Sequence, residues 1–202
     1  MPSLPLTLTA RLLPVAVLAT AGWAMARPAE EARSDSPASD KERTAAAAPT
    51  IAGPPADACT AIPAATVKEL VPGAKTEGKE LGTSDPKRRT GCAWNALKGF
   101  DYRWLDVTFE ITDAKSARAV YADREQAGVT EDLGDEASTG SKITKDDGQE
   151  TREVTIIVRK ANALVTVVYN GADFDNEKAP GAGEMEKGAT SAAKVALSAL
   201  KS

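Results

Sequence analysis

The sequence predicts an α+β domain in which helices cover an antiparallel sheet of about five strands. Residues 105–111 alternate between apolar and polar side chains, which is typical of a half-buried strand. Two runs rich in β-branched residues, 154–158 and 164–169, predict a further pair of strands. Residues 183–200 carry apolar side chains at helical spacing. The short connections between neighbouring strands favour antiparallel pairing.

The sequence of the first half of the domain predicts one helix and one hairpin. Residues 64–70 form a short helix, which a Pro-Gly pair at 72–73 ends. Residues 92–96 are expected to form a strand, and a Lys-Gly turn at 98–99 leads into the alternating strand. One face of that second strand is apolar and consists of Leu105, Val107, Phe109 and Ile111.

The second half predicts a helix, a weak strand, two strong strands and a final helix. Thr112 or Asp113 caps the first of these helices, whose apolar face is narrow. From residue 137 to Gln149 the chain is polar, so only a weak strand is expected there. Residues 161–162 form the bend between the two strong strands. The final helix places one apolar stripe on the sheet, made of Met185, Ala189, Ala193, Ala196, Leu197 and Leu200.

Residues 1–26 predict a signal peptide or a membrane anchor. An apolar stretch follows Arg11 and ends in Ala24-Met25-Ala26, the small-x-small pattern that precedes signal-peptidase cleavage. The stretch contains Pro14 and is shorter than the roughly twenty residues that cross a bilayer, which favours a cleaved signal. An uncleaved, tilted span is the alternative. Both predict an extracytoplasmic protein, either secreted or tethered to the membrane.

Residues 27–56 predict a disordered linker that leads to a folded domain at 57–202. The linker consists mainly of Ala, Pro, Ser and charged residues and offers almost no apolar surface to bury. Such a segment behaves as a flexible tether. We therefore expect it to be dispensable for folding.

The only two cysteines, Cys59 and Cys92, are expected to form a disulfide. Export places both thiols in an oxidising compartment, where an even number of cysteines in a modest domain is typically bridged. A redox-active pair is the alternative, but that role favours closely spaced cysteines. Closing a loop of this length stabilises the fold by about 3.7 kcal/mol if the effect is chain entropy alone.

Composition excludes several classes of function. Without residues 1–26, 24 basic residues face 29 acidic residues, a formal charge of −5. The densest basic run is only Lys87-Arg88-Arg89, so a nucleic-acid partner is not expected. The chain has no histidine, the commonest general base and metal ligand. We expect no cofactor, no metal and no catalytic residue.

Two acidic clusters have simple structural interpretations. The carboxylates at 132, 135 and 136 could bind a cation or form an acid–base pair, but turn chemistry around Gly134, expected at positive φ, explains them more simply. The acidic residues at 173–177 have the spacing that opens a calcium loop. Lys178 stands where an EF-hand needs glycine, so an acidic solvated loop is expected instead.

Tyr102, Arg103 and Trp104 form the candidate contact surface for a ligand or partner, because aromatic residues and arginine dominate recognition sites. Phe100, Tyr102 and Trp104 share one parity, whereas the apolar residues from Leu105 onward have the other. Three arrangements fit: a β-bulge, a long strand with the aromatic residues on its other face, or a loop. The alternative role of these residues is a minor core under the second helix.

Four elements follow one another in a recognisable order. They are Cys59, Gly91-Cys92-Ala93-Trp94, Leu133-Gly134-Asp135-Glu136-Ala137 and residues 158–167. In this order they resemble the DUF3558 family, over residues 57–200. Members are exported actinobacterial proteins, many of them lipoproteins, so the resemblance implies an extracytoplasmic envelope domain. It implies no reaction, and this chain lacks a lipobox cysteine behind its apolar stretch.

Together these features predict a non-catalytic binding or sensor-like module of the cell envelope. Its partner would be an envelope component, a small ligand or another exported protein, with membrane contact only through the N-terminal segment. One alternative is a hydrolase of envelope material, which needs two carboxylates about 5 to 9.5 Å apart across a cleft. The other alternative is a purely structural envelope protein.

Overall fold

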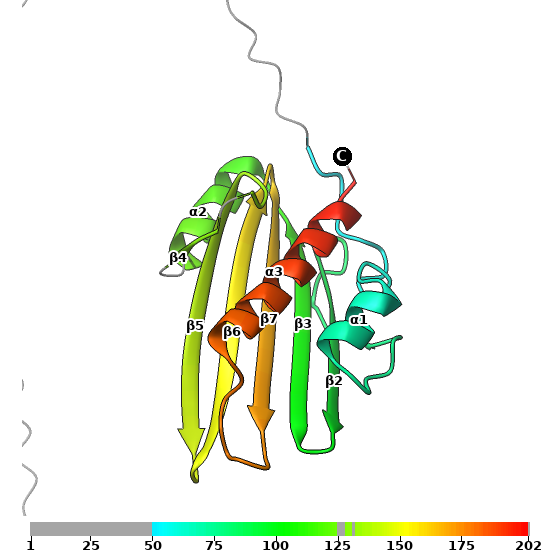
Figure 1. Cartoon of the computed structure of the whole chain (residues 1–202). Coiled ribbons are helices and arrows are strands. Elements are labelled where there is room, and N and C mark those ends of the chain that lie inside the picture. The colour runs from blue at the N-terminus through cyan, green and yellow to red at the C-terminus, as the bar shows by residue number, and fades with distance from the viewer. Residues whose placement is uncertain (1–49, 125–127, 131, 202) are drawn as a thin grey trace, which may run out of the picture. The chain divides into compact units, whose positions relative to one another are not determined.

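The computed structural model describes residues 50–124, 128–130 and 132–201, which form an α+β domain (Figure 1). Within these residues an antiparallel sheet has the strand order β1-β2-β3-β7-β6-β5-β4 and is accompanied by three helices. The predicted signal segment and most of the predicted linker lie outside the described residues. Among the described helices, none combines the length and the hydropathy that a membrane-spanning helix requires.

Of the strands in the described residues, five are long and two contain only two residues. The long strands are β2 (Arg89–Lys98), β3 (Asp101–Ile111), β5 (Glu136–Asp146), β6 (Gln149–Lys160) and β7 (Ala163–Asp173), and the short ones are β1 (Lys79–Glu80) and β4 (Gly128–Val129). The helices are α1 (Ala64–Leu70), α2 (Ala114–Arg124) and α3 (Ala182–Ala199). The prediction of an antiparallel sheet of about five strands with helices is therefore confirmed in its main features.

The sheet joins a hairpin to a three-stranded meander. β2 and β3 form the hairpin, and β5, β6 and β7 follow one another through short turns. The two parts meet where β3 pairs with β7, from Asp101 opposite Asp173 to Ile111 opposite Ala163. The central pairing therefore connects strands that are far apart in the sequence.

β5 is longer than the sequence predicts. The polar segment after residue 137 pairs with β6 along its whole length, from Glu136 opposite Arg159 to Asp146 opposite Gln149. Only Ala137 and Ser138 of β5 are buried. The strand is therefore held by backbone hydrogen bonds to a strong neighbour, and these do not depend on an apolar side-chain pattern.

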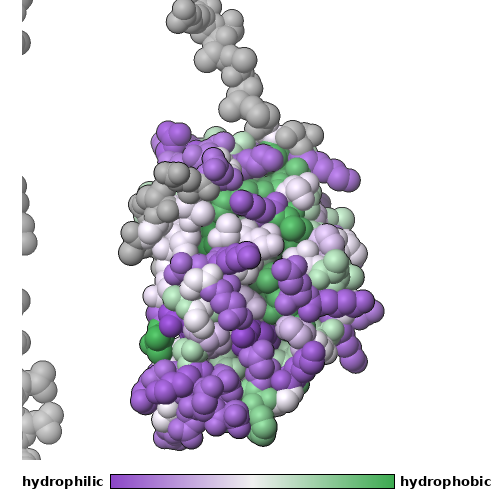
Figure 2. Space-filling view, viewed as in Figure 1, coloured by the Kyte–Doolittle hydropathy of each residue, from purple (hydrophilic) through white to green (hydrophobic). Residues whose placement is uncertain are grey.

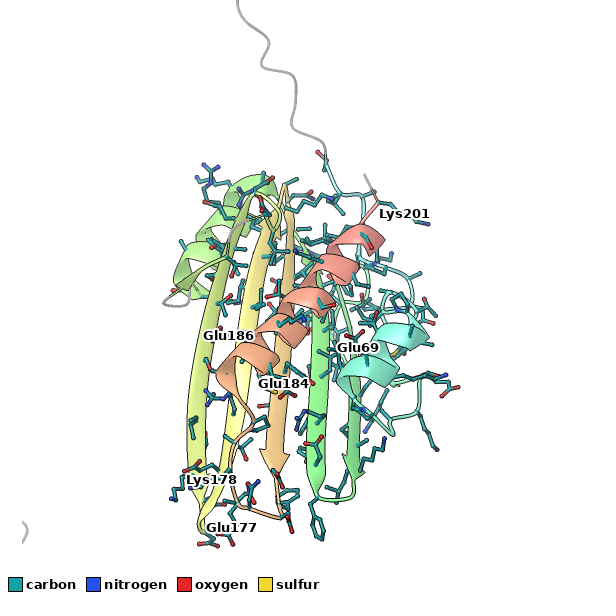
Figure 3. The ribbon with its side chains drawn as sticks, in the orientation of Figure 1. Glu69, Glu177, Lys178, Glu184, Glu186 and Lys201 are labelled. Carbon is teal, nitrogen blue, oxygen red and sulfur yellow. A yellow bond between two sulfur atoms is a disulfide. The ribbon has the colours of Figure 1, made fainter. Side chains whose placement is uncertain are left out.

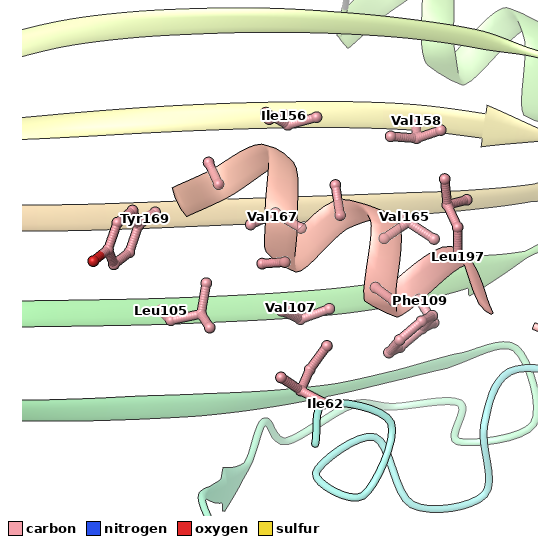
Figure 4. Packing of buried hydrophobic residues seen from close by; sticks show 14 of the residues in the cluster. Ile62, Leu105, Val107, Phe109, Ile156, Val158, Val165, Val167, Tyr169 and Leu197 are labelled. Atoms are coloured by element: carbon pink, nitrogen blue, oxygen red, sulfur yellow. The ribbon is translucent and has the colours of Figure 1, made fainter. Parts of the chain in front are cut away.

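The main core lies between α3 and one face of the sheet, which we call the α3 face. Figure 4 shows the packing of this layer, to which β3 contributes Leu105, Val107 and Phe109. All six residues of the predicted α3 stripe are buried. Close approach depends on Gly188, where a Cβ atom would lie 2.8 Å from the Tyr169 ring. The Tyr169 hydroxyl donates to Leu70 O at 2.5 Å and so links β7 to α1.

α2 packs on the opposite face and covers only one end of it. Its buried residues Ala117 and Tyr121 form a small cluster with Ile157 of β6 and Leu164 of β7. Successive residues of a strand point to opposite faces, so Ile157 and Leu164 face away from the α3 layer. The rest of this face, which we call the open face, lacks a covering helix among the described residues.

Cys59 and Cys92 form the predicted disulfide. Their Cα atoms are 5.0 Å apart, and the bridge joins the segment before α1 to β2 across 33 residues. Trp94 packs beside it and donates from Nε1 to Thr76 O at 3.1 Å. Gly78, at φ 65°, leaves room for both side chains, because a Cβ atom there would lie 2.5 Å from Cys92 Sγ.

The folded domain begins before residue 57, so the predicted linker boundary is too late. Ile51 is only 2% exposed and belongs to the main core. Its N–H donates to Asn162 Oδ1 at 2.7 Å, and its carbonyl accepts from Asn162 Nδ2 at 3.0 Å. Pro55 O accepts a hydrogen bond from Thr90 Oγ1 at 3.1 Å. Residues 50–56 are thus part of the domain.

This boundary gives the first prediction. Ile51→Ala should lower the free energy of unfolding by about 2 to 4 kcal/mol, because it removes a buried side chain from the core. Deletion of residues 1–49 should leave the unfolding midpoint unchanged, and deletion of residues 1–56 should lower it. Urea unfolding followed by circular dichroism measures all three. Equal midpoints for the two deletions would contradict this boundary.

Candidate functional site

β3 separates the three predicted contact residues. The strand pairs without interruption with β2 and β7, so it contains no bulge between Trp104 and Leu105. Tyr102 and Trp104 therefore lie on the open face, and Arg103 lies on the α3 face with Leu105. Of the three arrangements compatible with the sequence, the long strand is the one present. The expectation that Arg103 shares a surface with the two aromatic residues is wrong.

Arg103 is a buried link between the sheet and α3. Only 8% of the residue is exposed. Its Nη2 donates to Glu184 Oε1 at 3.1 Å, and its Nη1 donates to Tyr102 O at 3.1 Å and to the Asp101 carboxylate. Figure 3 shows Glu184 at the start of α3, over the sheet. These contacts give Arg103 a structural role.

Tyr102 and Trp104 belong to a larger exposed surface at the end of the sheet where the β2–β3 turn lies. We call this surface the aromatic patch. It consists of Leu97, Phe100, Tyr102, Trp104 and Phe174. Four of these are among the few large hydrophobic residues with high exposure, at 58% for Leu97, 61% for Phe100, 38% for Trp104 and 46% for Phe174.

Strand pairing and one loop bring the members of the patch together. Leu97 lies directly opposite Tyr102 in the β2–β3 pair. The rings of Tyr102 and Phe174 have centroids 6.2 Å apart and are tilted by 43°, a favourable aromatic arrangement. The N–H of Phe174 donates to Phe100 O at 2.9 Å, which fixes the segment after β7 against the β2–β3 turn. The patch is therefore preformed.

A carboxylate adjoins the patch on the open face of β3. Trp104 Nε1 donates to Asp106 Oδ1 at 2.6 Å. Burial raises the pKa of the Asp106 carboxyl, and the bond from Trp104 only partly opposes this. Burial also raises the pKa of the Tyr102 hydroxyl, with a further contribution from the charge of Asp106. Both groups lie in a partly desolvated surface.

The view in Figure 2 shows the side of the domain that carries α3. Hydrophilic side chains dominate there, above all around the β5–β6 turn, and hydrophobic atoms occur in limited areas. Ile143, on the α3 face of β5, is one of the few large hydrophobic residues exposed outside the patch, at 51%. Tyr102 and Trp104 of the aromatic patch lie on the other, open face.

Two of the acidic residues at 132–136, Asp135 and Glu136, position other groups. Arg159 donates from Nη1 to Asp135 Oδ2 at 2.9 Å and from Nε to Glu136. Asp135 Oδ2 also accepts the N–H of Ala161 at 2.7 Å. Gly134 has the expected positive φ, 61°. The turn interpretation is thus correct, although the hydrogen bonds reach the distant β6–β7 turn. Within the described residues, no group of three metal-ligating side chains is present.

The acidic segment after β7 is a hydrogen-bonded turn. Asp173 Oδ1 accepts the N–H of Asp175 at 2.9 Å, and its Oδ2 accepts from Asn176 Nδ2 at 2.7 Å. Lys178 then pairs with Asp173 in an isolated β-bridge. This arrangement agrees with the expected solvated loop.

Two members of the patch were not predicted from the sequence. Leu97 lies on the same face as Tyr102, but this follows only from the hairpin register. Phe174 is a single aromatic residue in an acidic loop, and that isolation is a signal that could have indicated a surface role. Its contact with Tyr102 depends on the pairing of β3 with β7.

The geometry defines a helix-covered antiparallel-sheet domain with an exposed aromatic patch. No protein-family model matches the chain, and no curated protein sequence matches it. The resemblance to the DUF3558 family stays a prediction from the sequence.

The raised pKa of Asp106 gives the second prediction. A carboxyl whose pKa is higher in the folded state favours folding while it is protonated, and this contribution is lost as the pH rises through the folded pKa. Asp106→Asn removes the charge but keeps an oxygen that accepts from Trp104. The variant should therefore have a higher melting midpoint than the wild type at pH 7. The difference should disappear below the ordinary pKa of aspartate.

Thermal unfolding between pH 3 and pH 7 measures this difference. Asp146→Asn is the matched control, because that exposed residue lies at the end of β5 and should change stability by less than about 0.5 kcal/mol. A lower melting midpoint of Asp106→Asn than of the wild type at pH 7 would contradict the prediction, because it would show that the charged carboxylate stabilises the fold.

Proposed function

We propose that this domain is a non-catalytic, extracytoplasmic binding module that contacts its partner through the aromatic patch. One observation carries the proposal. Eight aromatic residues lie in the described part of the chain, and four of them, Phe100, Tyr102, Trp104 and Phe174, are in the patch. Half of the described aromatic residues thus lie at the surface, although large rings usually contribute to a core.

Exposed rings on a rigid support are suited to recognition. Burying a large apolar side chain is favourable by about 1.5 to 3 kcal/mol. A partner that covers the patch buries apolar surface that stays exposed in the folded domain, and this burial favours binding. Tryptophan and tyrosine are also enriched among the residues that dominate binding energy. The backbone around the patch is hydrogen-bonded on both sides, so little ordering is needed on binding.

The surroundings of the patch indicate the chemistry of the partner. Asp106 lies beside Trp104 on the open face, and Asp175 follows Phe174 in the sequence. Lys98 is next to Leu97 in the sequence, but it has the opposite parity in β2 and lies on the α3 face. A partner with apolar side chains at its centre and basic residues at its margin complements this surface. We therefore propose a polypeptide partner, namely another exported protein with an apolar and basic contact segment.

Two features support an extracytoplasmic site of action. The Cys59–Cys92 disulfide is compatible with an oxidising compartment. The resemblance to the DUF3558 family implies the same location and suggests the cell envelope. A carboxylate-dependent hydrolase has less support, because Asp135 and Glu136 both bind the Arg159 guanidinium.

Peptide selection tests the proposal and gives the third prediction. The full chain is immobilised and used to select binders from a library of random dodecapeptides. Selected peptides should be rich in aromatic, aliphatic and basic residues. Trp104→Ala and Phe174→Ser should each weaken the selected peptides at least about tenfold, because each removes a ring from the contact.

Ile143→Ser is the matched control, since it removes an exposed hydrophobic residue from the other face. All three variants should keep the unfolding free energy of the wild type within about 1 kcal/mol. Peptides that bind the two patch variants as tightly as the wild type would overturn the proposed contact surface. So would a Trp104→Ala variant that is unfolded.

A further inference from the structure

A second candidate site lies at the opposite end of the sheet from the aromatic patch. A pocket of about 640 Å³ is formed by the start of the described chain, the first turns of α2, Asp135 and the β6–β7 turn. Leu164, next to this turn, and Ala172, opposite Tyr102, are eight residues apart along β7. At the rise of a β-strand this separation is about 26 Å. The pocket and the patch are therefore distinct sites.

The pocket is strongly basic, although the chain has a net charge of −4. Four cationic side chains line it: Lys115, Arg118, Arg159 and Lys160. Among the described lining residues Asp135 is the only carboxylate, and the neighbouring Glu136 also pairs with Arg159. Asp113, just before α2, is engaged elsewhere, because its two carboxylate oxygens accept from the backbone and hydroxyl of Ser116. The balance of charge in the pocket favours an anion.

Arg159 is held rigidly in this pocket with part of its guanidinium free. The residue is only 7% exposed. Asp135 and Glu136 accept from Nη1 and Nε, and Ala161 O accepts from Nη1 at 3.0 Å. Nη2 makes no hydrogen bond to a described residue. Every fully buried side-chain nitrogen of the described part has a partner, so Nη2 is not fully buried. Nη2 is therefore accessible, and its two N–H donors are oriented in advance for an acceptor.

Three further cations line the pocket around Arg159, and none has a salt-bridge partner among the described residues. They are Lys115, Arg118 and Lys160. Lys115 and Arg118 are three residues apart on α2 and so share one side of the helix. Like charges gathered around one cavity repel each other, and an anion bound between them removes that repulsion.

Hydrogen bonds hold Ala161 and Asn162, which line the pocket, in place. Asn162, which is buried, donates from Nδ2 to Ile51 O at 3.0 Å and to Thr112 O at 2.9 Å. The neighbouring Ala161 has a φ of 55° and is fixed by the hydrogen bond from its N–H to Asp135. The volume falls within the range of small-molecule sites and exceeds the space that a bare oxyanion fills.

We propose that this pocket binds the phosphate or carboxylate group of a small anionic molecule. Arg159 is the preoriented donor, because a guanidinium matches planar and tetrahedral oxyanions, and the flexible Lys115, Arg118 and Lys160 add charge around it. The remaining space accepts an organic part of the ligand beside Ala114 and Ala161. The site does not depend on the proposed function of the aromatic patch.

A titration of the ¹⁵N-labelled full chain tests the proposal. The probes are inorganic phosphate, octyl phosphate and the uncharged octyl glucoside, at constant ionic strength with sodium chloride as reference. Phosphate and octyl phosphate should shift the amide signals of residues 114–118 and 159–162 and reach saturation. Octyl glucoside should not. Equal affinities for the two phosphates assign the site to a free anion, and tighter binding of octyl phosphate assigns it to an amphiphile headgroup.

Surface variants keep the test independent of folding. Arg118→Gln and Lys160→Gln should each weaken phosphate binding at least about fivefold, since each removes one charge-assisted contact. Lys194→Gln, an exposed lysine on α3, is the matched control and should leave phosphate binding unchanged. The proposal is overturned if the shifts fail to saturate, if they spread over the whole surface, or if both pocket variants bind phosphate like the wild type.

Discussion

The register of β3 between β2 and β7 determines which side chains of this domain are buried and which are exposed. β3 is paired on both sides along its length, so a shift of one residue would move every one of its side chains to the other face. In the observed register the α3 face of β3 contributes three large side chains to the main core under α3, namely Leu105, Val107 and Phe109. The same register necessarily turns Tyr102 and Trp104 to the open face. The main core and the exposed aromatic patch are thus consequences of one pairing.

The two helices that cover the sheet leave its two ends with different chemistry. α3 crosses the α3 face, whereas α2 reaches only the end of the open face near Leu164 (Figure 1). At that end the first turns of α2 and the β6–β7 turn enclose a basic pocket around Arg159. At the other end no described helix covers the aromatic residues. The two binding sites that we propose, for a polypeptide and for a small anion, therefore lie at opposite ends of the sheet.

Local patterns in the sequence predicted the parts of the fold that depend on local physics. The alternation in β3 and the apolar stripe of α3 are readable because burial imposes a period of 2 or 3.6. The cysteine pair was predicted because the expected export favours a bridge. The length of β5, the burial of Ile51 and the position of Phe174 depend on contacts with distant segments. Arg103 was misplaced for a related reason, since its face follows from the continuity of β3 through Trp104 and Leu105. No local sequence pattern predicts the ring contact between Phe174 and Tyr102. The same is true of the ion pairs that Arg159 forms with Asp135 and Glu136.

Hydroxyl-radical footprinting of the native full chain, read residue by residue by mass spectrometry, tests the face assignment most directly. Trp104 and Phe109 lie in the same strand but on opposite faces, and Phe109 is fully buried. The structure predicts rapid modification of Phe100, Trp104 and Phe174 and strong protection of Phe109. Protection of Trp104 equal to that of Phe109 would contradict it, because the aromatic residues of β3 would then be part of a core and the patch would not exist.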